Sequence, residues 1–265
     1  MGAFAAIDLN VDLGERPGAE GVAGDARLIG LVTSANVACG FHAGDVETMR
    51  ATCAAAVAAG VRIGAHVGYR DLETFGRRAL DVAPARLREE SDEQLAALAE
   101  AARAEGATVT YVKPHGALYH RCGTDAEAAE AITAAAAACE GIIAMLGLPG
   151  AALLATAERH GLRTVAEGFA DRGYAASGQL LGRDEPGATL EAAAAGRQAV
   201  ALATGAPVAL GDGERALPPV GSLCLHSDGP GAHETARAVR AALAAARIEL
   251  RPSSNGSRHP SGFTW

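Results

Sequence analysis

Short apolar runs alternate along the chain with longer stretches in which alanine-rich apolar positions recur at helical spacing. The predicted strands are residues 5–11, 33–39, 61–67, 108–114, 141–147, 163–169 and 222–228, with a weaker strand at 206–212. The predicted helices are residues 45–60, 84–106, 125–140, 151–161, 189–205 and 233–248. Because strand and helix keep alternating, the pattern predicts a parallel sheet covered by helices.

Capping residues stand where these helices should begin and end. Asp45 and Asp125 precede two of them, where a carboxylate can accept a hydrogen bond from a free backbone N–H. Glycine closes four helices, as a left-handed C-terminal cap requires, at Gly60, Gly106, Gly161 and Gly205.

Unusual polar residues gather where the predicted strands end. No G-x-G-x-x-G follows the first strand, so a dinucleotide-binding sheet has no support and a closed barrel is the better prediction. In a barrel of parallel strands the carboxyl ends meet on one face, and the active site lies there. The polar strand-end residues are Asp8, Asn10, Asp12, Asn36, His42, His66, Lys113, His115, Glu167, Asp171, Arg172, His226 and Asp228.

Length and charge narrow the class of protein. No linker divides the 265 residues, so we expect one domain over residues 1–251 and a loose, turn-rich tail at 252–265. The net charge of −8 argues against a nucleic-acid partner, which would need a basic face. The N-terminus lacks the basic region of a secretory signal, and no tract resembles a membrane span. We therefore expect a cytoplasmic protein.

Lys113 is the only lysine among 23 basic residues. Arginine and lysine exchange on a solvated surface, so the lysine indicates that something excludes arginine here. Lysine offers a compact charge, and burial can lower the pKa of its amine, whereas arginine has neither property. The preceding residues predict a buried strand, and Pro114 ends its hydrogen bonding, so Lys113 and His115 project from a rigid bend. We predict a catalytic role for both.

Imidazole and carboxylate groups accompany this lysine. Asp12, His42 and His66 could act as general acids and bases. The same three residues could instead hold zinc or a similar ion with an open position, but without a local H-x-x-x-H spacing we favour acid–base work and expect no metal. A P-loop is absent, because valine precedes Lys113 and proline follows it. Glycines before predicted helices, in "GFHAGD" and "GLPGAALLA", are only weak phosphate-binding signals.

Seven motifs together resemble the LamB/YcsF family over about residues 7–250. The motifs, in order, are "DLNVDLGE" (8–15), "SANVACGFHAGD" (34–45), "GAHVGYRD" (64–71), "FGRR" (75–78), "VKPHGALY" (112–119), "FADRGY" (169–174) and "CLHSD" (224–228). The chain departs from the family's usual residues at Val11, Val67, Thr74, Gly168 and Ser227. None of these departures removes a charged group or an imidazole.

The resemblance implies a distorted seven-stranded parallel β/α barrel of the glycoside hydrolase/deacetylase type. It also implies the ATP-dependent opening of the lactam 5-oxo-L-proline to L-glutamate by a multi-subunit 5-oxoprolinase, in which the family supplies the A component. The B and C components are the implied partner subunits, and ATP with Mg²⁺ is the implied cofactor.

Under this hypothesis, Asp12 with His42 or His66 activates water. Lys113 balances negative charge on a phosphate or on the tetrahedral oxygen, and His115 protonates the departing ring nitrogen. Asp171 and Arg172 orient these groups or bind the substrate carboxylate. The full set of predicted substrate-binding residues is Asn10, Asn36, Asp171, Arg172, His226 and Asp228.

Two alternatives stay open. One is a metal-dependent deacetylase acting on an amide or an N-acetyl sugar without ATP. The other is a non-catalytic component that delivers the lactam to its partners.

Overall fold

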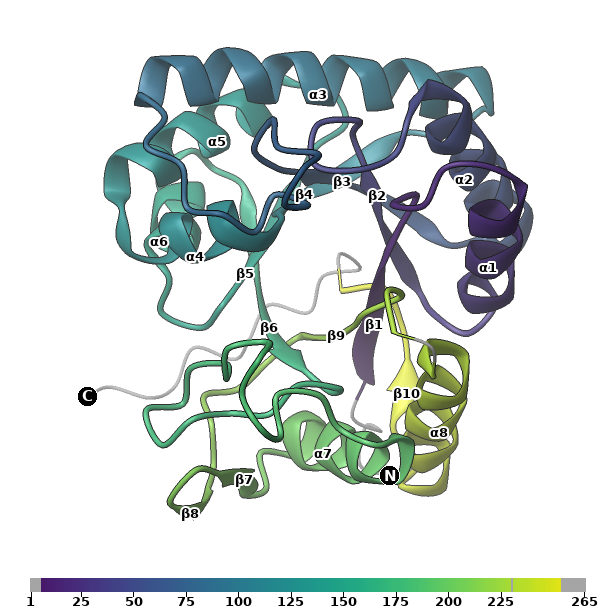
Figure 1. The fold of residues 1–265 in the computed structure, drawn as a ribbon, viewed down its shortest axis with the longest axis vertical. Helices are drawn as coiled ribbons and strands as arrows, with labels where there is room; N and C mark the ends of the chain where they lie inside the picture. The colour runs from purple at the N-terminus through teal and green to yellow at the C-terminus, as the bar shows by residue number, and fades with distance from the viewer. Residues whose placement is uncertain (1–5, 230, 254–265) are drawn as a thin grey trace.

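The structure is a computed structural model that describes residues 6–229 and 231–253. Seven parallel strands form a closed barrel, as Figure 1 shows, in the order β1-β2-β3-β4-β5-β6-β9. The barrel closes because β1 pairs with β2 on one side and with β9 on the other. The barrel strands are β1 (Ala6–Leu13), β2 (Ser34–Ala38), β3 (Arg62–Val67), β4 (Val109–Pro114), β5 (Ala144–Gly147), β6 (Arg163–Phe169) and β9 (Ser222–Leu225). The predicted fold is confirmed, and its distortion appears as unequal strand lengths, from eight residues in β1 to four in β5.

Helices surround the barrel (Figure 1). They are α1 (Ala19–Ile29), α2 (Val46–Ala59), α3 (Pro84–Ala104), α4 (Gly116–Thr124), α5 (Ala126–Ala138), α6 (Ala152–Arg159), α7 (Ala192–Thr204) and α8 (Ala232–Ala245). In the described ranges, none of these helices combines the length and the apolar character needed to cross a membrane.

The predicted caps hold the helix ends. Asp45 accepts a 2.7 Å hydrogen bond from the backbone N–H of Thr48 at the start of α2. Asp125 likewise accepts from two N–H groups at the start of α5. Gly60 and Gly205 end α2 and α7 in the left-handed conformation, with φ of 66° and 73°.

Three features differ from the sequence prediction. Helices α1 and α4 were not predicted. The weak strand at 206–212 becomes β7 (Val208–Leu210), which pairs antiparallel with β8 (Gly213–Arg215) outside the barrel. A short β10 (Glu249–Leu250) pairs with the beginning of β1. Of the predicted loose tail at 252–265, residues 254–265 lie outside the described part of the chain.

Strand β1 shows how the barrel separates two buried environments. Successive side chains of a strand point to opposite faces, and the apolar members of β1 join the core between barrel and helices. Asp8, Asn10 and Asp12 alternate with them and face the barrel interior, where their hydrogen-bond partners on neighbouring strands also lie. Every β1 residue after Ala6 is buried. The barrel is therefore apolar outside and, at this strand, polar inside.

Candidate active site

A cleft of about 820 Å³ contains the carboxyl ends of β1, β3, β4 and β6 and the residue that follows β9. The predicted convergence at this face is confirmed, because the cleft unites residues from almost opposite ends of the chain. Six predicted site residues line it: Asp12, His66, Lys113, His115, Arg172 and His226.

Hydrogen-bonded polar side chains fill the barrel interior next to the cleft. Asn36 Nδ2 donates to Asn10 Oδ1 and to Asp12 Oδ1, at 2.7 Å in each case. Asn10 Nδ2 donates to Ser222 Oγ at 2.7 Å, and the Tyr111 hydroxyl donates to Asn36 Oδ1 at 2.7 Å. Both asparagines are completely buried and are not among the residues that line the cleft. We therefore propose that they position Asp12, instead of contacting substrate as the sequence suggested.

Lys113 is only 2% exposed and is surrounded by acceptors. Its Nζ lies 3.1 Å from Glu167 Oε2, 3.3 Å from Asp12 Oδ1 and 3.0 Å from Cys224 Sγ. Burial by itself would lower the pKa of the amine, but the neighbouring acidic groups raise it well above its usual value. The sequence allowed burial to lower the pKa of Lys113. In the structure the acidic neighbours instead keep its amine protonated and charged.

The charge of Asp12 is maintained in the same way. Burial opposes ionisation of this carboxyl, but His66 and Lys113 outweigh burial and hold its pKa well below the usual range. Asp12 Oδ2 lies 3.4 Å from His66 Nε2. The floor of the cleft thus carries an ionised carboxylate beside an imidazole, which is the arrangement of a general base.

Backbone carbonyls determine which nitrogens of His66 and His115 carry protons. His66 Nδ1 lies 3.0 Å from the carbonyl oxygen of Lys113, and His115 Nε2 lies 2.9 Å from that of Phe75. A carbonyl can only accept, so both of these nitrogens must donate. The remaining nitrogens, His66 Nε2 and His115 Nδ1, face one another at 2.9 Å.

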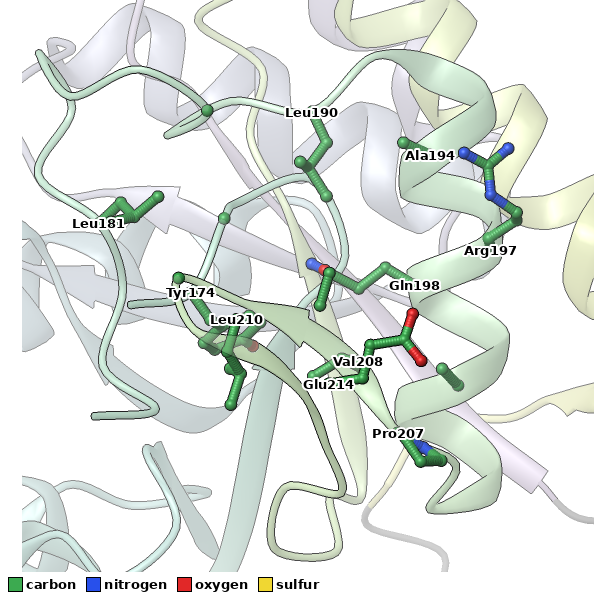
Figure 2. A pocket seen from close by; sticks show the side chains of 15 residues that line it. Tyr174, Leu181, Leu190, Ala194, Arg197, Gln198, Pro207, Val208, Leu210 and Glu214 are labelled. Atoms are coloured by element: carbon green, nitrogen blue, oxygen red, sulfur yellow. The ribbon is translucent and has the colours of Figure 1, made fainter. Parts of the chain in front are cut away.

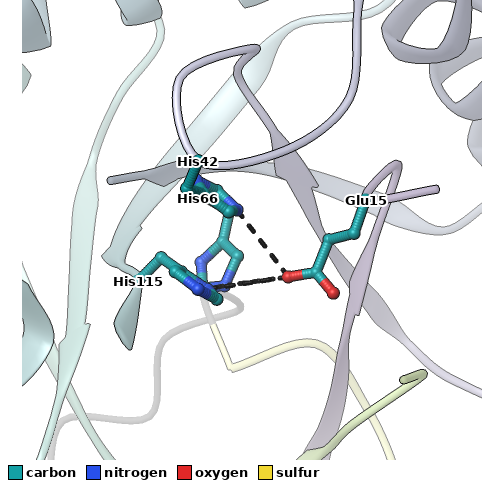
Figure 3. A group of neighbouring side chains, drawn as sticks. All are labelled: Glu15, His42, His66 and His115. Atoms are coloured by element: carbon teal, nitrogen blue, oxygen red, sulfur yellow. Dashed lines mark hydrogen bonds and ion pairs between the residues drawn. The ribbon is translucent and has the colours of Figure 1, made fainter. Parts of the chain in front are cut away.

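His42 and Glu15 complete this group, as Figure 3 shows. Glu15 Oε1 lies 3.7 Å from His42 Nε2 and 3.6 Å from His115 Nδ1. Burial, followed by the neighbouring imidazoles, lowers the pKa of His42 and of His115 well below the usual value. His115 Nε2 is occupied by the Phe75 carbonyl and His115 Nδ1 faces His66, so the proton-donor role of His115 stays a prediction.

Glycines allow the loops to approach these histidines closely. A Cβ on Gly68 would lie 2.6 Å from His42 Nδ1, and one on Gly76 would lie 2.8 Å from His42 Cβ. Gly44, within the "GFHAGD" motif, has φ of 75°, and an added Cβ would lie 2.3 Å from the carbonyl oxygen of Gly14. Phe75 takes the left-handed conformation with φ of 57° although it is not glycine. Strain of this kind gathers at functional sites.

Asp171 orients His226 on the other side of the cleft. One carboxylate oxygen accepts from the backbone N–H of His226 at 2.8 Å, and both oxygens lie 3.1 Å from its Nδ1. This pairing holds the proton on Nδ1 and leaves Nε2 available for proton transfer. Asp171 lines an adjoining pocket that shares Arg172 and His226 with the large cleft, so we propose that it orients His226, and its contact with substrate stays a prediction.

Arginines surround the mouth of the cleft. Arg77 and Arg183 both donate to Asp228 Oδ2, at 2.5 and 2.8 Å. Arg172 donates to the carbonyl oxygens of Ala188 and Leu181, so part of its guanidinium already holds the nearby loop in place. Asp228 therefore pairs with two arginines, which leaves a net positive charge on the three groups, and it lies outside the lining of the large cleft.

Two described groups of side chains could hold a metal ion. The first is Glu15 with His42, His66 and His115, and the second is Asp12 with Cys224 and His226. The first is entirely buried, whereas in the second Asp12 and Cys224 already contact the Lys113 ammonium.

Glu15, Arg77 and Arg183 were not predicted as site residues, and Glu167 was given no role. Glu167 had a visible signal, since it is the one charged residue within the otherwise uncharged run "TVAEGF". Glu15 and Arg77 belong to recognisable motifs but follow no strand periodicity.

A separate cavity of about 400 Å³ lies between α7, β7 and the loop that follows β6. Figure 2 shows that Leu181, Leu190, Val208 and Leu210 account for much of its wall. Arg197 and Glu214 are the only ionisable residues besides Tyr174 in this lining. The cavity therefore lacks the convergent acid–base groups of the large cleft.

Known proteins share both sequence and fold with this chain. A protein of Streptomyces griseus, named as the A component of 5-oxoprolinase, is 51% identical over 246 residues, which cover 92% of this chain and 98% of that protein. The crystal structure of a lactam utilization protein from Thermus thermophilus matches with a TM-score of 0.85 and 40% identity, over 93% of this chain and 99% of that one.

A more distant match concerns the fold alone. The catalytic domain of a peptidoglycan N-acetylglucosamine deacetylase from Eubacterium rectale has a TM-score of 0.52 at 10% identity, over 98% of this chain and 95% of that domain. The sequence profile of the LamB/YcsF family matches residues 7–258. The chain belongs to the LamB/YcsF family.

Proposed function

We propose that this chain opens the lactam ring of 5-oxo-L-proline as the A component of an ATP-dependent 5-oxoprolinase, with the B and C components as partner subunits. The observation that carries the proposal is the charged Lys113 in the floor of the cleft, beside Asp12 and His66 and across from His226. The names of the Streptomyces and Thermus relatives support the substrate class.

Each step of lactam hydrolysis finds a suitable group. Asp12 and His66 lie 3.4 Å apart and would accept a proton from the attacking water. The positive charge of Lys113 would stabilise the oxygen anion that develops on the lactam carbon. His226, whose Nδ1 is held by Asp171, would act as an imidazolium and donate its Nε2 proton to the ring nitrogen as the C–N bond breaks.

The ATP requirement comes from the family resemblance, and the chain's own groups limit where a nucleotide could bind. The start of α2, which follows "GFHAGD", is already capped by the Asp45 carboxylate. A second anion at this helix end would meet like charge, so this weak phosphate signal loses its support. Arg183, at the mouth of the cleft, carries the charge that a phosphate would need.

The test is glutamate release from 5-oxoproline with Mg-ATP, measured for this chain alone, for the two partners alone and for all three together. We expect release only from the full mixture. Lys113→Arg in this chain should keep the charge but abolish most turnover, because a guanidinium does not fit between Glu167, Asp12 and Cys224. His160→Gln, on a surface pair with Glu130, is the matched control and should leave turnover unchanged. Unchanged turnover in Lys113→Arg would refute the role of the lysine.

The buried histidine and glutamate cluster favours one further candidate, a metal-dependent deacetylase. Release of acetate from N-acetylglucosamine oligomers without ATP would support this candidate, and its absence alongside glutamate release would exclude it. The third candidate, a delivery component, predicts that variants at His42, His66 and His115 alter the apparent affinity for the lactam but not turnover at saturating substrate.

A further inference from the structure

We propose that Glu15, His42, His66 and His115 form a binding site for one divalent transition-metal ion of the zinc type. Figure 3 shows the four side chains converging from the β1, β2, β3 and β4 ends of the barrel. The proposal concerns ion binding and holds whichever substrate the cleft accepts.

Ring nitrogens of two histidines, His66 and His115, face one another at the centre of the four side chains. The carbonyl oxygens of Lys113 and Phe75 fix protons on His66 Nδ1 and His115 Nε2. In the neutral rings, His66 Nε2 and His115 Nδ1 then both present lone pairs, and these atoms are only 2.9 Å apart. At this distance either a shared proton or a bound cation must separate the two lone pairs, and the unpartnered atoms beside them favour the cation.

Two further side chains point unpartnered atoms at the same place. Within the described residues, Glu15 Oε1 and both ring nitrogens of His42 are buried without a hydrogen-bond partner. His42 is 0% exposed and Glu15 is 7% exposed. Buried polar atoms almost always have partners, and each unpartnered one indicates an ion, a water or a functional role. Two of these atoms, Glu15 Oε1 and His42 Nε2, face each other at 3.7 Å beside the paired nitrogens of His66 and His115, and together they indicate an ion.

The distances fit coordination after small movements. From Glu15 Oε1 the nitrogens of His115, His42 and His66 lie at 3.6, 3.7 and 4.0 Å. An ion with bonds of about 2.0–2.1 Å places tetrahedral ligand atoms about 3.3 Å apart. The three nitrogens therefore need to approach Glu15 Oε1 by less than about 1 Å, while His66 Nε2 and His115 Nδ1 must separate slightly from 2.9 Å. The rings of His42 and His115 are stacked with centroids 3.9 Å apart, so one ring must turn to direct its lone pair at a shared ion.

The surroundings resemble the outer shell of a metal site. Histidine ligands almost always donate their other N–H to a carbonyl or carboxylate, which fixes the tautomer and the ring orientation. His66 and His115 do so here. Gly68 and Gly76 have no side chains and therefore pack closely against His42, which holds its ring within the cluster.

The donor set selects the type of ion. Three imidazoles and one carboxylate suit zinc, cobalt or nickel, whereas magnesium prefers oxygen ligands and retains its waters. The alternative group of Asp12, Cys224 and His226 is less suited, because the Lys113 ammonium lies 3.0 Å from Cys224 Sγ and 3.3 Å from Asp12 Oδ1. A divalent ion there would meet that positive charge.

Calorimetric titration of the chelator-treated full chain with ZnCl₂ tests the site. We expect one ion per chain with submicromolar affinity that excess MgCl₂ does not displace. Glu15→Gln and His115→Ala should each weaken binding by at least the roughly 10–100-fold that the loss of an outer-shell partner costs. His160→Gln, which alters an exposed histidine–glutamate pair, and Cys224→Ser should bind as the unaltered chain does.

Cobalt provides a second measurement that needs no variant. The chain saturated with Co²⁺ should show intense visible absorption from a four-coordinate ion with nitrogen and oxygen ligands, and one equivalent of Zn²⁺ should remove it. Absence of stoichiometric Zn²⁺ binding by the unaltered chain would overturn the proposal. So would binding that survives Glu15→Gln in a folded protein, or binding that Cys224→Ser abolishes.

Discussion

Replacing Lys113 by methionine should destabilise the protein strongly, because it leaves two buried carboxylates without a cation. Nζ lies 3.1 Å from Glu167 Oε2 and 3.3 Å from Asp12 Oδ1. At an effective dielectric constant of about 20, each contact is worth about 5 kcal/mol of Coulomb energy, most of it offset by desolvation of the ions. Breaking a buried pair by removing one partner costs about 3–5 kcal/mol, a large fraction of a typical free energy of unfolding.

Urea denaturation followed by circular dichroism measures this loss. We expect Lys113→Met to lower the midpoint by about 1–2 M urea. The informative control is the same substitution in a chain that also carries Asp12→Asn and Glu167→Gln. There the lysine is a buried charge without a counter-charge, so Lys113→Met should raise the midpoint. Lys113→Met is therefore expected to lower the urea midpoint of the unaltered chain and to raise the midpoint of the chain that lacks both carboxylates.

A loss of less than about 1 kcal/mol in the free energy of unfolding on Lys113→Met, in the otherwise unaltered chain, would refute the role of these ion pairs. An equal loss of stability in the unaltered chain and in the chain that carries Asp12→Asn and Glu167→Gln would refute it as well. Either result would show that lysine packing, and not its ion pairs, determines stability at this position.

Three further predictions follow from local geometry. Gly44→Ala should lower the melting temperature more than Gly40→Ala, because both positions have positive φ but only Gly44 has backbone within 2.3 Å of the added Cβ; equal losses would contradict this account. Burial opposes the ionisation of Asp228, but the nearby arginines and His226 lower the pKa of its carboxyl. The contribution of Asp228 to stability is therefore fully present above about pH 4 and is lost as the pH falls through the folded-state pKa. Asp228→Asn should therefore destabilise the chain at pH 7, and this loss should shrink as the pH falls below about 4; a pH-independent difference between the melting curves would argue against it. Asp171→Asn should reduce glutamate release by the full mixture at least about tenfold with the melting temperature preserved, because His226 loses the partner that fixes its tautomer; full turnover would exclude this role.

The barrel strands were predictable because their apolar runs and strand–helix alternation are strong. Helix α1 was missed because Gly21 and Gly24 weaken its helical pattern. The structure shows why glycine is needed: a Cβ on Gly21 would lie 1.8 Å from the carbonyl oxygen of Arg16. Tertiary packing thus overrides local propensity in this segment. Helix α4 was missed because it begins directly after β4 and no side chain caps its first turn.

The candidate site was predictable only where strand periodicity continues. His66 and Lys113 lie within predicted strands, Asp12 continues the alternation one residue beyond the predicted strand 5–11, and all three line the cleft. Glu15 lies beyond the end of β1, where alternation no longer determines side-chain direction. Arg183 belongs to an irregular loop, and only the folded chain shows that it shares a carboxylate with a residue far away in sequence.

The pairing of β1 with β9, which closes the barrel, also determines when the site can form during synthesis of the chain. The hydrogen bond from Ser222 to Asp8 spans 214 residues, so Asp12 and His226 cannot meet until nearly the whole chain has left the ribosome. Until then β1 and β6 are open edges, and unpaired edges are where parallel sheets aggregate. We expect the barrel to be vulnerable late in synthesis. Substitutions near residues 222–225 should therefore reduce the yield of soluble protein more than equally buried substitutions in β3.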